Sequence, residues 1–186
     1  MALLFANASL RAFAHVSVLF IISALMDVSW GLGVRGSGLA VGAIQVGAGA
    51  GGVFISMITP AGRERRPALY CVPWSVMLLV PLALTGGWVW CLWLFLYGAC
   101  VNGPAPAVVA LAQHVAPRRS ALASGLIVGI AFAVAGPVAS VTSPWLLEHA
   151  GQAATIGLLA VPLGLSYIAA KLLKVGREDS GPMGRA

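Results

Sequence analysis

Charge is what this sequence has least of. Charged residues make up 9% of its 186 residues, whereas hydrophobic residues make up 60%. A soluble domain carries about 25% charged residues to cover its surface, so this composition excludes an ordinary soluble protein. The net charge of +6 does not indicate a nucleic-acid partner. The basic residues fall in short connections between apolar runs, where membrane topology and anionic lipid headgroups account for them.

The residue sets that membrane-embedded enzymes require are also missing. An intramembrane aspartyl protease needs two aspartates within its helices, and this chain offers only Asp27 there. A metalloprotease needs paired histidine ligands, which the three histidines do not form. The cysteines, all inside predicted helices, follow no zinc-ligand spacing and read as small apolar residues: Cys71, Cys91 and Cys100. We therefore expect no enzyme, no cofactor and no metal site.

What the sequence does contain is a series of six long apolar runs. The second run has 21 residues, which at about 1.5 Å per residue nearly matches a hydrocarbon core of about 30 Å. We therefore expect an all-α polytopic membrane protein with six transmembrane helices in residues 1–174. A flexible, polar and Gly-rich cytoplasmic tail should follow over residues 175–186. The predicted spans are residues 12–31, 38–58, 67–86, 88–113, 121–146 and 152–173.

The distribution of positive charge predicts the orientation of these spans. If the runs cross a bilayer alternately, only Arg35 falls on one side. Basic residues stay on the cytoplasmic face during insertion, so both termini should be cytoplasmic in a multi-pass protein of the bacterial inner (plasma) membrane. The ten basic residues on the cytoplasmic side are Arg11, Arg63, Arg65, Arg66, Arg118, Arg119, Lys171, Lys174, Arg177 and Arg185.

Prolines interrupt four of the predicted spans near the same depth. A proline inside a helix leaves the carbonyl four residues earlier without its donor. Such backbone is tolerated in a membrane only where it meets protein or a water-filled cavity. One interpretation is a kink that only helps packing; four interruptions at one depth favour a cavity or a flexing point. The prolines are Pro81, Pro104, Pro106, Pro137 and Pro162.

The sharpest local pattern is Asn102-Gly103-Pro104-Ala105-Pro106, in the middle of the fourth span. Polar side chains at that depth usually face the bundle interior. Asn102 either contacts a substrate beside a helix break or forms an interhelical hydrogen bond that holds the bundle together. The same two interpretations apply to Gln45 in the second span. Gln45, Asn102, Pro104 and Pro106 are the candidate residues of a substrate path.

Asp27 is the one carboxylate inside a predicted span. That position makes it a candidate for proton coupling. Arg35 is close in sequence, so a solvated ion pair at the membrane interface is the competing interpretation.

Glycines recur four residues apart in the second and fifth spans. Gly38 to Gly42 and Gly125 to Gly129 enclose similar short sequences, and each pair lies in the middle helix of a set of three. Two triplets of opposite topology are a common plan among transporters, so we expect a 3+3 inverted-repeat bundle. Gly47 and Gly51 have the same spacing, which allows a neighbouring helix to approach closely.

Three stretches resemble one six-helix half of a major facilitator superfamily transporter. The first is the glycine-rich second span followed by a basic loop. Gly62 and Arg63 fit that family's loop motif, whereas Thr59 and Pro60 replace its acidic residue and first arginine. Arg65 and Arg66 complete the basic run. The second stretch, from Gly98 through Pro104 to Ala116-Pro117-Arg118-Arg119-Ser120, is similar to the family's passage into the eleventh helix, and the third is Gly136-Pro137.

The resemblance implies a secondary transporter of two such halves, similar to the fosmidomycin-resistance type of drug efflux protein. A small-molecule substrate would bind between the halves, which would rock to give alternating access. The second half would be a missing N-terminal half, a second copy of this chain or a separate partner chain. The alternative is a structural or assembly subunit that transports nothing, or an inactive truncated fragment.

Overall fold

The computed structural model describes residues 2–26, 31–60 and 62–173, and every regular element in these ranges is helical. The all-α class predicted from the sequence is confirmed. Asp27 and the expected tail over 175–186 lie outside the described residues. The elements are α1 (Ala2–Ala24), α2 (Gly33–Ile58), α3 (Arg65–Leu84), α4 (Val89–Asn102), α5 (Ala105–Val115), η2 (Pro117–Arg119), α6 (Ser120–Gly125), η3 (Leu126–Ile130), α7 (Ala131–Leu158) and α8 (Ala160–Leu172).

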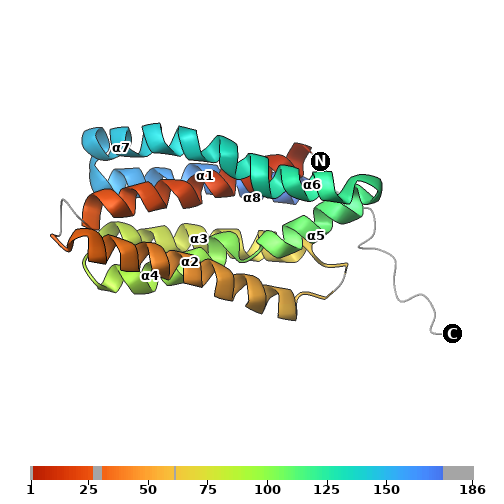
Figure 1. The fold of residues 1–186 in the computed structure, drawn as a ribbon, viewed down its shortest axis with the longest axis horizontal. Coiled ribbons are helices and arrows are strands. Elements are labelled where there is room, and N and C mark those ends of the chain that lie inside the picture. The colour runs from red at the N-terminus through yellow and green to blue at the C-terminus, as the bar shows by residue number, and fades with distance from the viewer. Residues whose placement is uncertain (1, 27–30, 61, 174–186) are drawn as a thin grey trace.

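The helices run side by side in a bundle of two layers (Figure 1). One layer holds α1 with α7 and α8, and the other holds α2 with α3 and α4. Contacts from α3 to α8 and from α1 to α4 join the layers. The start of α1 and the end of α8 lie at the same end of the bundle (Figure 1).

Five stretches of the described chain are long and apolar enough to cross a membrane. Their outer surfaces are apolar as well: Val34 is 84% exposed, Met57 80% and Leu84 77%. Soluble monomers rarely expose contiguous apolar surface on this scale. These features indicate a membrane-embedded protein. The stretches are Ala2–Ala24, Gly33–Ile58, Arg65–Leu84, Val89–Val115 and Pro117–Leu172.

The last of these stretches turns back on itself. Its 56 residues would extend about 84 Å as one straight helix at 1.5 Å per residue. Within α7, Gly151 has φ 77° and ψ 174°, where two helices meet at a kink. That backbone conformation is open to glycine because it has no Cβ. The chain reverses at this kink, so the last turns of α7 run back along the bundle and continue into α8 (Figure 1).

Helix α1 begins ten residues before its predicted start at Ala12. The sequence-based interpretation counted Arg11 among the cytoplasmic basic residues, just before the first span, because basic residues stay on that face during insertion. In the structure Arg11 lies inside α1 and is only 3% exposed. The helix therefore begins earlier than the expected span, and contacts with neighbouring helices surround the Arg11 side chain in place of water.

Glycines bring α2 and α4 into direct backbone contact. A Cβ on Gly47 would lie 2.0 Å from the carbonyl oxygen of Phe95, and one on Gly51 would lie 2.5 Å from that of Ala99. The contact is reciprocal, because a Cβ on Gly98 of α4 would lie 2.1 Å from the carbonyl oxygen of Ile44. The predicted close approach at Gly47 and Gly51 is therefore observed, with α4 as the neighbour.

The prolines differ in what they do to the helices. The helix of the fourth span ends at Asn102 and resumes at Ala105, so a break lies at Gly103-Pro104. Helix α3 continues through Pro81 and α7 through Pro137, so these two do not break their helices. Pro162 lies in the first turn of α8, where a missing N–H costs no helical hydrogen bond.

Candidate functional site

The candidate site lies halfway along the bundle. Asn102 is 13 residues from either end of the apolar stretch Val89–Val115. Arg11 is two residues from Phe13, the central residue of α1. Both residues are therefore near the depth of the bilayer centre in a bundle that crosses the membrane.

One face of α1 carries three polar side chains spaced four residues apart: Asn7, Arg11 and His15. Residues at this spacing share a helix face, and all three are buried. Each one joins α1 to a different helix. The Asn7 side-chain amide donates to the carbonyl of Ser166 in α8 (2.7 Å), Arg11 reaches α4, and the His15 ring interacts with Gln45 of α2.

Arg11 caps the interrupted end of α4. The last turn of a helix leaves carbonyls without intrahelical donors, and the break after Asn102 puts such an end inside the bundle. Arg11 Nε donates to the carbonyl oxygen of Val101 at 2.7 Å, and Nη2 donates to the same atom. A charged donor makes a stronger bond than a neutral one, so Arg11 stabilises the broken helix.

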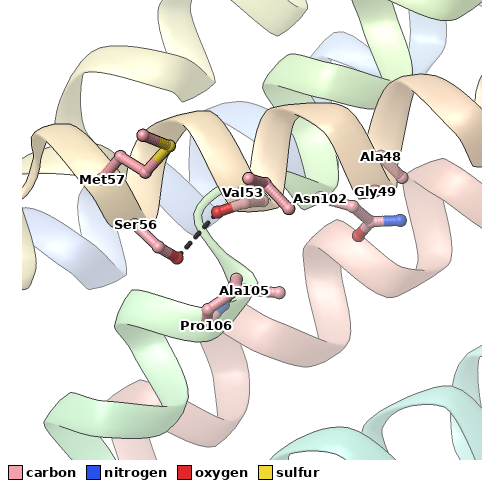
Figure 2. A pocket seen from close by; sticks show the side chains of 9 residues that line it. Ala48, Gly49, Val53, Ser56, Met57, Asn102, Ala105 and Pro106 are labelled. Carbon is pink, nitrogen blue, oxygen red and sulfur yellow. Dashed lines mark hydrogen bonds between the residues drawn. The ribbon is translucent and has the colours of Figure 1, made fainter.

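An open groove of about 650 Å³ lies between α2 and the start of α5. Figure 2 shows its two walls, with Ser56 of α2 donating along its own helix to the carbonyl of Gly52 (2.7 Å). Most of the lining is apolar or glycine, and Asn102 and Ser56 are its polar side chains. The lining residues are Ala48, Gly49, Gly52, Val53, Ser56, Met57, Asn102, Ala105 and Pro106.

A smaller chamber of about 70 Å³ lies between α1, α5, η3 and the start of α7. Its polar lining comes from Arg11 and Asn102, and the rest is apolar. Asn102 and Ala105 line both the chamber and the groove, so the two spaces adjoin there. The apolar lining residues of the chamber are Ala8, Ala105, Val108, Val109, Ile127, Val128 and Phe132.

The far wall of the chamber includes a stretch of π-helix. The segment η3 (Leu126–Ile130) supplies Ile127 and Val128. Wider helical turns of this kind recur at functional sites. Phe132, one turn further on, lines the chamber and meets the edge of His15, with ring centroids 6.4 Å apart.

Among the predicted path residues, the structure brings Asn102 and Pro106 to the groove and places Pro104 in the adjoining break. The amide of Asn102 forms no hydrogen bond with any described residue. Nothing in the described chain therefore matches the interhelical bond considered for it. Gln45 is exposed on α2 and lines neither space.

The predicted cytoplasmic loop forms a tight turn at the end of the bundle. Gly62, at φ 87°, donates its backbone N–H to Oε1 of Glu64 (2.9 Å). Arg65 Nε donates to the carbonyl of Ala170 (3.0 Å), and Nη2 donates to that of Lys171. Arg65 thus caps the end of α8, whereas Arg63 and Arg66 are exposed.

Sequence reasoning missed Arg11, His15 and Phe132 as site residues. The four-residue spacing of Asn7, Arg11 and His15 was a usable signal, because a polar row on a span indicates an inward face. The contribution of Phe132 had no comparable signal. Within the described residues, no three His, Cys, Asp or Glu side chains are placed to hold a metal ion.

Comparison with known proteins adds no relative: no family model, no curated protein and no solved structure matches this chain. The functional conclusion is therefore drawn from the chain's own residues.

Proposed function

We propose that this chain is a six-span half of a secondary transporter that moves a small molecule by alternating access. The observation that carries the proposal is the meeting of a groove and a chamber at an unpaired amide, Asn102, beside a break in the helix at mid-membrane depth. An amide without a protein partner at that depth is costly unless water or a substrate satisfies it.

The kink at Gly151 supports the count of six spans. The stretch Pro117–Leu172 is too long for one crossing, and the non-helical residue divides it into two arms. Counted in this way, the proposal has six crossings, and the repeated glycine pattern of the second and fifth spans supports a 3+3 inverted repeat. The α2–α3 loop, the η2 turn and the end of α8, all of which carry basic residues, lie at one end of the bundle (Figure 1). We assign this end to the cytoplasm of the bacterial inner membrane.

The second half of the transporter belongs on the open glycine faces. Nothing lies within 4 Å of a Cβ placed on Gly42 or Gly49 in α2, or on Gly125, Gly129 or Gly136 in the fifth predicted span. Small residues mark the surfaces through which membrane helices associate. For the purified chain by itself, the second half is a second copy, and we expect a native gel to give the mass of two chains.

The proposal is tested by water accessibility at Asn102. In a background with Cys71, Cys91 and Cys100 replaced by Ala, an Asn102→Cys thiol should react with a membrane-impermeant, charged thiol reagent. Labelling from either side of oriented vesicles is the result expected of alternating access. A passive structural subunit predicts no reaction from either side.

Two control positions make the labelling interpretable. Leu94, eight residues before Asn102 in α4, is fully buried (0% exposed). A Leu94→Cys thiol should therefore not react. Trp74→Cys is exposed on the outer surface (60%) but faces lipid, so a charged reagent should not reach it either. Reaction at Trp74→Cys as fast as at Asn102→Cys would contradict a water path at the bilayer centre.

Flux provides the second test. Asn102→Ala in a chain that transports should slow both uptake and efflux, because the substrate loses an amide contact in the path. Unchanged rates would assign Asn102 to packing alone.

A further inference from the structure

Arg11 is a buried cation without a carboxylate partner in the described chain. Its side chain is 3% exposed. The described acidic residues are Glu64, which accepts from the Gly62 amide in the loop and lies 3.8 Å from His114, and Glu148, which is exposed near the opposite end. A buried charge normally requires a charge partner, because losing hydration is costly.

The hydrogen bonds of Arg11 leave much of its guanidinium unused. A guanidinium has five N–H donors, and Nε and one N–H of Nη2 share the carbonyl oxygen of Val101. The remaining three N–H groups make no hydrogen bond with a described residue. Capping of α4 therefore occupies one edge of the group and leaves donors for a second ligand.

The small chamber is where such a ligand fits. Arg11 and the unpaired amide of Asn102 are its polar lining, and its volume is about 70 Å³. Since a water molecule takes up about 30 Å³ in the liquid, the chamber holds a group of a few heavy atoms. The apolar remainder of the lining limits competing water, which strengthens an ionic hydrogen bond.

We propose that the chamber binds an oxyanionic head group, a carboxylate or a phosphoryl group, of the molecule that enters through the groove. Arg11 supplies the opposite charge and two donors from one edge, and Asn102 supplies an amide donor from α4. The inference rests on the proposed transport function and names its substrate class: small organic anions whose remainder extends past Ala105 into the groove. A neutral molecule of the same shape would leave the guanidinium without its partner.

The experiment measures ligand-induced thermal stabilisation of the purified chain in zwitterionic nanodiscs, at constant ionic strength set with sodium chloride. The probes are propionate and its neutral isostere propionamide, with methylphosphonate as the phosphoryl arm. We expect a saturable rise in melting temperature with at least one anion and none with propionamide. An equal response to propionamide, or no response to either anion, would overturn the inference.

Variants locate the response in the chamber. Arg11→Gln should weaken the response to the anion about tenfold or more, as loss of a charged hydrogen bond predicts. Arg11→Lys keeps the charge but not the planar fork and should retain part of the response. Asn102→Ala should weaken it less than Arg11→Gln does. An Arg11→Gln chain that responds like the unmodified protein would refute the assignment.

A second variant covers the case in which Arg11→Gln does not fold. Ala105→Leu keeps Arg11 in place and fills the space where chamber and groove adjoin. It should abolish the anion response, and an undiminished response would place the anion elsewhere. Adding phosphatidylglycerol to the nanodiscs distinguishes a lipid headgroup from a free anion: loss of the propionate effect in its presence would identify the lipid as the occupant and refute a soluble substrate.

This test and the labelling of Asn102→Cys fail independently. Labelling without an anion response leaves a transporter whose substrate is not anionic. An anion response without labelling leaves an anion site in a protein that is not a transporter of the proposed kind.

Discussion

The two faces of α2 carry the same residue type and have opposite surroundings. Gly47 and Gly51 are buried against α4, so closely that a Cβ on either would overlap a backbone carbonyl of that helix. Gly42 and Gly49 are open, because a Cβ on either would have nothing within 4 Å. Gly47 and Gly49 are two residues apart, which is about 200° around the helix, so the packed and open stripes point in opposite directions.

The glycines of α2 therefore serve two different tasks, one on each face of the helix. The packed glycines hold α2 to α4 within the bundle, where close backbone approach maximises van der Waals contact. The open glycines leave an equally smooth surface on the outside, which in our proposal receives the second half of the transporter. Substitutions on the two faces should therefore affect different measurements.

The largest expected effect is at the packed face. Gly47→Ala and Gly51→Ala should each lower the free energy of unfolding by about 1–3 kcal/mol, the usual cost of overpacking. Gly47→Ala should be the more damaging, because its Cβ would lie 2.0 Å from a rigid carbonyl oxygen, against 2.5 Å for Gly51→Ala. Thermal unfolding in detergent, followed by loss of the monodisperse chromatographic peak, measures the effect.

The matched control is Gly42→Ala, on the same helix and with the same change of volume. Its melting temperature should not fall. If Gly42→Ala and Gly47→Ala were equally destabilised, the distinction between the faces would be wrong.

A smaller effect, on assembly and not on folding, is expected from bulk on the open face. Gly42→Leu and Gly129→Leu add side chains where a Cβ meets nothing in the described bundle. The isolated bundle should unfold at an unchanged temperature, while association of two copies in a native gel weakens. Val80→Ala is the control for the gel, because it removes bulk from an exposed position on α3, away from the glycine face. Undiminished association in both leucine variants would show that the second half docks elsewhere.

The smallest expected effect is a gain in stability. Gly49→Ala should raise the free energy of unfolding by about 0.5–1 kcal/mol, since alanine in a helix interior loses less backbone entropy than glycine. Gly49 lines the groove, so the same variant should also narrow it and slow labelling of Asn102→Cys. A drop in stability would show that the open face is in contact with something in the isolated chain.

Parts of this architecture were predictable from the sequence. The length and spacing of the apolar runs predicted a helical membrane protein. The sequence Asn102-Gly103-Pro104 predicted a helix break, and among the prolines inside the described spans this is the site where the helix is interrupted. Gly47 and Gly51 were predicted to meet a close neighbour. These features are local: they depend on backbone donors, side-chain volume and run length, all of which are written along the chain.

Other features were beyond sequence reasoning for a physical reason. In a soluble helix, the contrast between apolar and polar residues indicates which face is buried. In a membrane the lipid is as apolar as the protein interior, so that contrast disappears. The pair Gly38 and Gly42 and the pair Gly47 and Gly51 have the same four-residue spacing, and the sequence does not distinguish the open glycine from the packed ones. The inward direction of Arg11 was hidden in a similar way, because a lone arginine near a chain end resembles an interfacial anchor.

The sequence by itself determined that the chain is helical, that it is embedded in a membrane and that its fourth span is interrupted at Gly103-Pro104, since each follows from local composition and backbone chemistry. Only the tertiary structure decided that Arg11 caps that interruption, that Asn102 faces a chamber and a groove, and which glycines are covered. These depend on which helix packs beside which, and neighbours brought together across some 90 residues leave no mark in the local pattern.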